Sequence, residues 1–169
     1  MMPTRQLFGL VALVLFSGTA LAMKEPKTGI NFPSTLKGAG SLTKLGVRTK
    51  GPVKVYAVGQ YDGGPTFLLQ MARGVGAEKM SSALADAIKP RCGDADAVEE
   101  FKEMLVKGLP NGAPKGLRMA FGTGGGKLSL TINDKSVGCV KSNSLAKAFV
   151  GVYSDKKAVC KMLPVEDTE

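Results

Sequence analysis

The sequence predicts an α+β fold in which an antiparallel sheet is covered on one face by helices. Strand-like segments come in blocks before and after two helix-like segments, without the steady βαβ alternation that indicates a parallel sheet. The 169 residues contain no internal repeat, and a composition of 44% hydrophobic and 22% charged residues is ordinary for a globular protein. A chain of this length is expected to form one domain with a sizeable core.

The strands of the first half are predicted from β-branched runs and turn signals. Residues 42–49 and 53–61 flank Gly51-Pro52, a dipeptide typical of turns, and therefore predict a β-hairpin. Residues 30–33 predict an edge strand that ends at a proline. Residues 67–71 predict a further strand.

After residue 71 the hydrophobic period changes to that of helices. From Met80 onward apolar residues recur at i, i+4, i+7 and i+8, which predicts an amphipathic helix that stops at Pro90. Asp94 or Asp96 is positioned to cap a second helix, which residues 108–110 would end. Both helices need a sheet to cover.

The second half predicts a strand meander and a closing helix. Apolar and polar residues alternate in segments that predict half-buried strands, at residues 117–121, 128–132 and 137–141. Asn133-Asp134 is typical of a tight turn, and Ser142 or Asn143 is expected to start the last helix.

The predicted hairpin sets a cation beside a phenol. If its strands pair symmetrically about Pro52, Arg48 lies opposite Tyr56, and both side chains point to one face of the sheet. The other face would be apolar and formed by Val47, Val53, Val55 and Ala57. A fork of N–H donors plus a phenolic O–H in apolar walls suits an anionic head group or a polarised carbonyl. The alternative is an arginine paired with a structural carboxylate and an ordinary strand tyrosine.

Residues 46–61 read GVRTKGPVKVYAVGQY, and this segment resembles the N-terminal core hairpin of the chalcone isomerase superfamily. The superfamily contains chalcone isomerases, fatty-acid-binding proteins and isomerase-like proteins without known catalysis. The resemblance extends from Gly29 to Lys161 and implies an open-faced β-sandwich with a ligand cleft between sheet and helices. We expect this domain to occupy residues 29–163.

Groups that the isomerases use are absent at the matching positions. Arg48 matches the family arginine, but Thr49 replaces a glycine, and Tyr56 stands where the enzymes have a strand threonine. Gly76 and Ala83 stand where the enzymes have a tyrosine and an asparagine, and the lysine before that tyrosine is missing. We therefore expect no catalytic residues. The resemblance implies Arg48, Tyr56 and Thr49 as ligand-binding residues.

The leading hypothesis is a noncatalytic protein that binds a fatty acid or a similar apolar carboxylate between sheet and helices, without a cofactor. Arg48 would pair with the carboxylate, and Tyr56 would donate a hydrogen bond to it. The alternative is an intramolecular lyase of the chalcone isomerase type, which uses a cation to hold a phenolate. A third possibility is a secreted accessory protein whose vestigial pocket is filled by side chains.

The first 22 residues are typical of a signal peptide. A basic residue, a short apolar run and the small-residue site Ala20-Leu21-Ala22 follow one another, so we expect cleavage after Ala22 and entry into an export or secretory route. An uncleaved anchor is the alternative, although the apolar stretch is shorter than the roughly 20 residues that a span needs. No span is expected in the mature chain. Residues 23–28 would be a lead-in and residues 164–169 an acidic tail.

The net charge of +9 raises the question of nucleic-acid or membrane partners. The lysines are dispersed and tryptophan is absent, so binding to nucleic acid is not expected. The distribution indicates a solvated surface, or alternatively attraction to anionic ligands or membrane surfaces.

The chain contains no histidine, which excludes the usual Cys/His zinc sites and any Ser-His or Cys-His nucleophile, and no metal is expected. Cys139 lies in an apolar strand pattern and is expected in the core. In an oxidising compartment, Cys92 and Cys160 would be the likelier disulfide pair.

Overall fold

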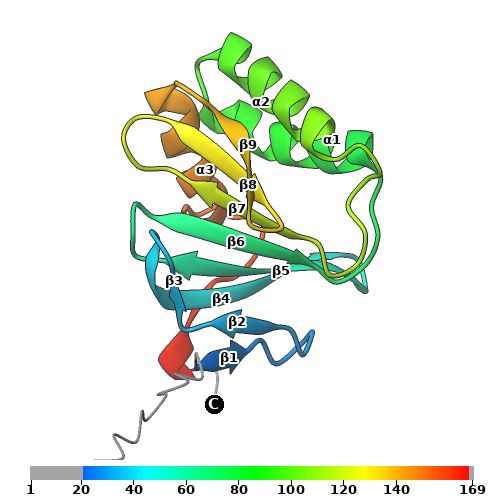
Figure 1. Cartoon of the computed structure of the whole chain (residues 1–169), viewed down its shortest axis with the longest axis vertical. Helices are drawn as coiled ribbons and strands as arrows, with labels where there is room; N and C mark the ends of the chain where they lie inside the picture. The colour runs from blue at the N-terminus through cyan, green and yellow to red at the C-terminus, as the bar shows by residue number, and fades with distance from the viewer. Residues whose placement is uncertain (1–20, 168–169) are drawn as a thin grey trace, which may run out of the picture.

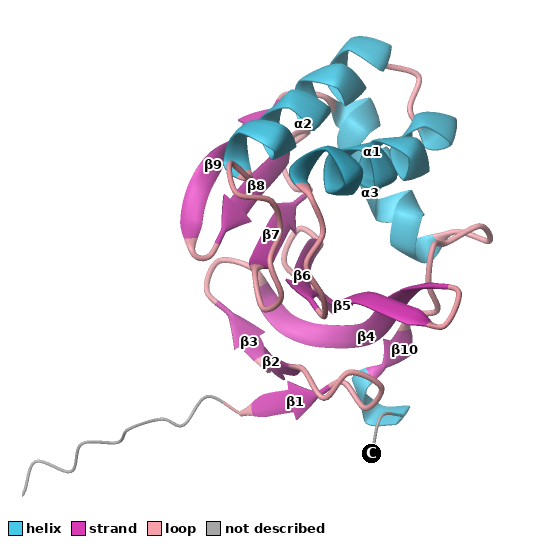
Figure 2. Cartoon of the chain, turned by 90° about the vertical axis from the view of Figure 1, so that its right-hand side faces the viewer, coloured by secondary structure: helices cyan, strands magenta, loops and turns pink. Residues whose placement is uncertain are grey.

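A computed structural model describes residues 21–167. An eight-stranded antiparallel sheet curls around three helices that cover one of its faces, which confirms the predicted α+β class (Figure 1, Figure 2). Its strands are β3 (Thr35–Leu36), β4 (Gly40–Lys50), β5 (Val53–Tyr61), β6 (Thr66–Met71), β7 (Arg118–Gly122), β8 (Leu128–Ile132), β9 (Lys135–Val140) and β10 (Leu163–Pro164). The order is β10-β4-β5-β6-β7-β8-β9, with β3 paired to β4.

The three helices are α1 (Ala77–Ile88), α2 (Ala95–Gly108) and α3 (Asn143–Ser154). The side chain of Asp94 accepts a hydrogen bond from the Ala97 amide and caps α2, and Ser142 caps α3 through the Leu145 amide. The Ser142 hydroxyl also donates to Asp94, at 3.0 Å, so the two caps are linked. Of the alternatives that the sequence left open, Asp94 and Ser142 are the caps.

The β4–β5 hairpin has the predicted pairing of Arg48 with Tyr56, but it contains a bulge. Gly51-Pro52 forms a two-residue turn, which sets Lys50 opposite Val53. Val55 is then left without a partner in β4, and the bulge restores the register at Tyr56.

The expectation that Val53 and Val55 face away from Tyr56 was wrong. Both valines line the same cavity as Tyr56, because the extra residue at the bulge turns their side chains to the helix-covered face. Ala57 follows the prediction and is buried on the opposite face.

A second bulge explains the position of Cys139, which is exposed and not in the core as expected. The turn between β8 and β9 places Asn133 and Asp134 at positive φ, 47° and 66°, as the sequence predicted for a tight turn. Val137 has no partner in β8, so Cys139 pairs with Ser129 on the outer face.

Cys92 and Cys160, the likelier disulfide pair for an oxidising compartment, are both free thiols in the structure. The sulfur of Cys92 lies 3.5 Å from the hydroxyl of Ser144, whereas that of Cys160 lies 3.9 Å from the sulfur of Met162.

Each face of the sheet has its own core. On the helix face, rings from the sheet and from α2 and α3 pack together; Phe121 and Phe149 lie 4.6 Å apart between centroids. On the outer face, Leu42, Ala57, Tyr61 and Leu68 pack with Phe32 of β2 (Asn31–Pro33), which forms a two-stranded sheet with β1 (Ala22–Lys24). Strand β1 was not predicted.

The C-terminal segment also differs from a plain tail. Strand β10 pairs with β4 through Leu163 and Leu45, and the residues Val165–Asp167 form a short 3-10 helix. The expected signal peptide lies outside the described residues except for Leu21 and Ala22. Within residues 21–167, no helix has the length and apolar character that membrane crossing requires.

Candidate functional site

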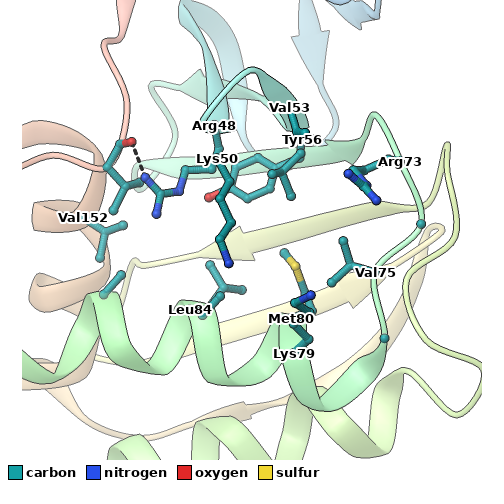
Figure 3. A pocket seen from close by; sticks show the side chains of 16 residues that line it. Arg48, Lys50, Val53, Tyr56, Arg73, Val75, Lys79, Met80, Leu84 and Val152 are labelled. Carbon is teal, nitrogen blue, oxygen red and sulfur yellow. Dashed lines mark hydrogen bonds between the residues drawn. The ribbon is translucent and has the colours of Figure 1, made fainter.

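A cavity of about 310 Å³ opens between the β4–β5 hairpin and α1 (Figure 3). This volume lies at the lower end of the ~300–1,000 Å³ typical of small-molecule sites. Helix α1 and its N-cap residue Gly76 form one wall as far as Ala87, a length of about 16 Å at the helical rise per residue. The apolar side chains in its walls are Val53, Val55, Val75, Met80, Ala83, Leu84, Ala87, Val152 and Val159.

Arg48 lies at the end of the cavity next to α3 (Figure 3). Its Nη1 donates a hydrogen bond of 2.8 Å to the backbone carbonyl of Val159, in the segment that follows α3. Among residues 21–167 its guanidinium has no carboxylate partner. This excludes the alternative in which Arg48 pairs with a structural carboxylate. Its other N–H groups remain available to an anion in the cavity.

Tyr56 is joined to a second phenol. Its hydroxyl oxygen lies 2.9 Å from that of Tyr153 on α3, and both residues are buried, with exposed fractions of 4% and 2%. Burial raises the pKa of both phenols well above the ordinary value, so both are protonated at neutral pH. The contact uses only one of the two hydroxyl hydrogens. When Tyr153 donates to Tyr56, the Tyr56 hydrogen is free for a group in the cavity, which Tyr56 lines and Tyr153 does not.

Arg91 lies outside the cavity and stabilises the segment that follows α3. The Val159 carbonyl of this segment accepts the hydrogen bond from Arg48. Arg91 makes a bidentate pair with Asp155, at 2.7 and 3.0 Å, and also donates to the carbonyls of Ala87 and Lys157. The hydrogen bonds from Arg91 lower the pKa of the Asp155 carboxyl below its usual value. These contacts tie the end of α1 to the turn after α3, and the Val159 amide completes the turn by donating to the Val152 carbonyl.

Three further cations surround the opening of the cavity. Lys50 comes from the end of β4, Arg73 from the loop after β6 and Lys79 from the first turn of α1 (Figure 3). All three are exposed, and none forms an ion pair within the described part of the chain. No Asp or Glu side chain lines the cavity, so its lining carries a net positive charge from Arg48, Lys50, Arg73 and Lys79.

The residues singled out in the sequence are only partly brought together. Arg48 and Tyr56 line the cavity, whereas Thr49 is exposed and lies outside its lining. Gly76 and Ala83 both line it and offer no side-chain hydrogen-bond donor.

Sequence reasoning missed Tyr153 and the cations at the opening. Tyr153 lies four residues after Phe149 on the apolar face of α3, so a phenol on an otherwise apolar helix face was the available signal. Lys50, Arg73 and Lys79 are far apart in the sequence, and no local pattern joins them.

No metal site is found in the described chain. Within residues 21–167, no group of three or more Cys, Asp or Glu side chains is placed to hold a metal ion. The polar groups of the cavity are guanidinium, ammonium and hydroxyl groups, which are donors suited to an anion.

This architecture is the chalcone isomerase-like fold. The structure is similar to that of a fatty-acid binding protein from Arabidopsis thaliana, with a TM-score of 0.74 and 19% sequence identity. The similarity covers 82% of this chain and 91% of that protein. No family model matches the sequence, and no curated protein matches it. At this level of identity the comparison defines the fold and leaves the ligand to be argued from the site.

Proposed function

We propose that this protein binds a fatty acid or a similar apolar carboxylate and does not catalyse a reaction. The observation that carries the proposal is the pairing of Arg48 with Tyr56 at one end of an apolar cavity that no carboxylate lines. A guanidinium and a protonated phenol are hydrogen-bond donors, and together they match the two oxygens of a carboxylate. The relative from Arabidopsis thaliana, which is described as a fatty-acid binding protein, has the same fold.

The cavity gives the ligand a direction. The carboxylate would lie at Arg48, and the alkyl chain would run along α1 past Leu84 and Met80 toward Gly76. Each buried CH2 group contributes about 0.8 kcal/mol, so the apolar walls supply most of the affinity. Arg48 and Tyr56 then set which end of the ligand enters.

Catalysis is disfavoured by what the cavity lacks. Stabilising an enolate requires placed donors in addition to the cation that holds the phenolate. Gly76 and Ala83 stand where the enzymes have a tyrosine and an asparagine and offer no side-chain donor, so Tyr56 is the one hydroxyl donor among the described residues that line the cavity. An accessory protein with a filled pocket is also disfavoured, because the cavity is open beside Arg48.

The proposal includes export of the protein. The pattern of residues 1–22, with small residues before Met23, supports entry into an export or secretory route. The bound acid would then be held in the compartment that the route reaches.

Native mass spectrometry of the purified protein tests the proposal. We expect a bound carboxylic acid that is released on denaturation, and we expect oleic acid to bind at least tenfold more weakly to Arg48→Ala, because an ion pair with hydrogen bonds contributes about 1.5–3 kcal/mol. Arg118→Ala is the matched control, since Arg118 is a strand arginine outside the cavity.

The proposal fails if no acid co-purifies and oleic acid binds wild type and Arg48→Ala equally. A chalcone assay separates the enzymatic alternative. Loss of chalcone absorbance above the spontaneous rate, and its abolition in Arg48→Ala, would establish a lyase in place of a binding protein.

A further inference from the structure

Six exposed cations gather at the end of the sheet where the cavity opens. Three surround the opening itself, and three line a neighbouring hollow of about 230 Å³ on the other side of the hairpin. The six are Lys27, Lys50, Lys54, Arg73, Lys79 and Lys115, and each is exposed. No carboxylate lines either hollow, and within residues 21–167 none of the six belongs to an ion pair.

The fold brings these cations together from separate segments. The β4–β5 turn, the loop after β6 and the loop before β7 meet along the right-hand edge of Figure 1, which faces the viewer in Figure 2. Two contacts fix the loops to one another: Val75 pairs with Ala113, and the Gly116 amide donates to the Met71 carbonyl. These two contacts fix the loops that carry Arg73 and Lys115.

Nearby acids offset only part of this charge. The Glu25 carboxylate is buried and accepts hydrogen bonds from the Lys27 and Thr28 amides and from the Thr28 hydroxyl. Glu78 stands beside Lys79 in the first turn of α1. One carboxylate ligand at Arg48 needs only that guanidinium, so the six exposed cations exceed what the proposed ligand requires.

We propose that this cationic end docks on an anionic lipid surface with the cavity opening toward the bilayer. The inference rests on the proposed function. An apolar acid resides in membranes, and a cavity that opens onto the bilayer lets the acid move between membrane and protein without crossing water. Anionic headgroups supply the complementary charge, and each Lys or Arg near such a surface strengthens binding about fivefold. The attraction acts within a Debye length of roughly 10 Å, so it requires the clustered arrangement seen here.

Sedimentation with lipid vesicles tests the inference. The full chain is mixed with vesicles of phosphatidylcholine alone or of phosphatidylcholine and phosphatidylglycerol in equal parts. The informative variant is Lys27→Gln/Lys54→Gln/Lys115→Gln, because these lysines flank the opening without lining the ligand cavity. The control is Lys127→Gln/Lys141→Gln/Lys147→Gln, which removes three exposed lysines that line neither hollow.

We expect the informative variant to bind anionic vesicles about 100-fold more weakly than wild type, and the control to lose less than about fivefold. Binding to vesicles of phosphatidylcholine alone should be equal in all three proteins. Residues 1–22 are common to the three chains, so any lipid affinity of that segment cancels in the comparison. Salt should weaken wild type more than the informative variant.

Calorimetric titration with oleic acid in the absence of vesicles separates this inference from the proposed function. We expect the informative variant to bind oleic acid as wild type does. Equal losses of vesicle affinity in the two triple variants, or no preference of wild type for anionic vesicles, would overturn the docking surface. Retained binding of oleic acid in that case would leave the proposed function standing.

Discussion

Arg48 Nη1 donates a hydrogen bond of 2.8 Å to the carbonyl of Val159, a residue 111 positions later in the chain. The bond joins the guanidinium on the β4–β5 hairpin to the segment between α3 and β10. Because Arg91 and Asp155 hold the same segment, the position of the guanidinium depends on residues that do not touch the cavity. The candidate binding site is therefore completed only when the C-terminal segment has docked.

The phenol pair makes a prediction about which hydroxyl serves the ligand. Tyr56→Phe should weaken binding of oleic acid about tenfold, because the carboxylate loses a donor. Tyr153→Phe should weaken it less than about threefold, since Tyr56 still donates, but should lower the free energy of unfolding by about 0.5–1.5 kcal/mol through the lost hydrogen bond. Calorimetric titration and thermal unfolding measure the two effects.

The opposite hydrogen-bond direction gives a different result. If Tyr56 donates to Tyr153, the Tyr56 hydroxyl has no hydrogen for the ligand, and Tyr56→Phe leaves the affinity for oleic acid unchanged. That outcome would remove Tyr56 from the proposed binding site and leave Arg48 as its main polar group.

Filling the cavity should weaken binding of oleic acid strongly without unfolding the protein. Ala83 is exposed on α1 and its side chain borders the cavity, so the indole of Ala83→Trp would occupy the space of the alkyl chain. We expect oleic acid to bind at least tenfold more weakly, with the free energy of unfolding changed by less than about 0.5 kcal/mol.

Ala95→Trp is the control for the cavity-filling variant, because Ala95 is exposed in the first turn of α2 and lies outside the cavity. Its affinity for oleic acid should equal that of wild type. Undiminished binding in Ala83→Trp would show that the ligand lies elsewhere.

Much of the local structure could be predicted from the sequence because it depends on local signals. The bounds of β5 agree with the predicted residues 53–61, and the caps of α2 and α3 were among those expected. The bounds of a strand and the caps of a helix depend on neighbouring residues alone. The pairing of Arg48 with Tyr56 was predicted for a turn centred on Pro52, whereas the structure reaches it through a two-residue turn and the bulge at Val55.

The errors arose where tertiary packing or a bulge changed the pattern. Val55 and Val137 are the unpaired residues of two bulges, and each shifts the side chains beside it to the opposite face. The contacts of Arg48 with Val159 and of Tyr56 with Tyr153 join distant segments, so no periodicity could reveal them. The sequence therefore predicted the strand residues of the candidate site, Arg48 and Tyr56, but not their partners Val159 and Tyr153.

Gly46 makes close packing of the C-terminal segment possible. A Cβ atom at this position would lie 2.5 Å from the sulfur of Met162 and 2.9 Å from the carbonyl oxygen of Lys161, a backbone atom that cannot rotate away. Gly46→Ala should lower the free energy of unfolding by about 1–3 kcal/mol, as overpacking does. Displacement of residues 159–162 should also weaken binding of oleic acid through Arg48.

Gly93→Ala is the control for this substitution, because a Cβ atom at Gly93 meets nothing within 4 Å. Denaturant unfolding and calorimetric titration of both variants check the prediction. Wild-type affinity in a destabilised Gly46→Ala would mean that the position of Arg48 does not depend on the C-terminal segment.

Stability at alkaline pH should depend on Cys160. Burial raises the pKa of this thiol from 9.0 to about 11, with the nearby Arg48 acting weakly in the opposite direction. The unfolded thiol therefore loses its proton at lower pH than the folded one, so its contribution to stability is complete below pH 9 and is lost as the pH rises to about 11. Cys160→Ala should remove about 2 kcal/mol of the decline over this range.

Thermal unfolding from pH 8 to pH 11 measures the decline in both proteins, and Cys139→Ala, which removes an exposed thiol, is the control. The buried phenols of Tyr56 and Tyr153 also have raised pKa values and remain in the variant, so a shallower decline is expected and not a flat one. Equal declines in wild type and Cys160→Ala would mean that this thiol is open to water, and the cavity end beside Arg48 would then be wetter than its packing indicates.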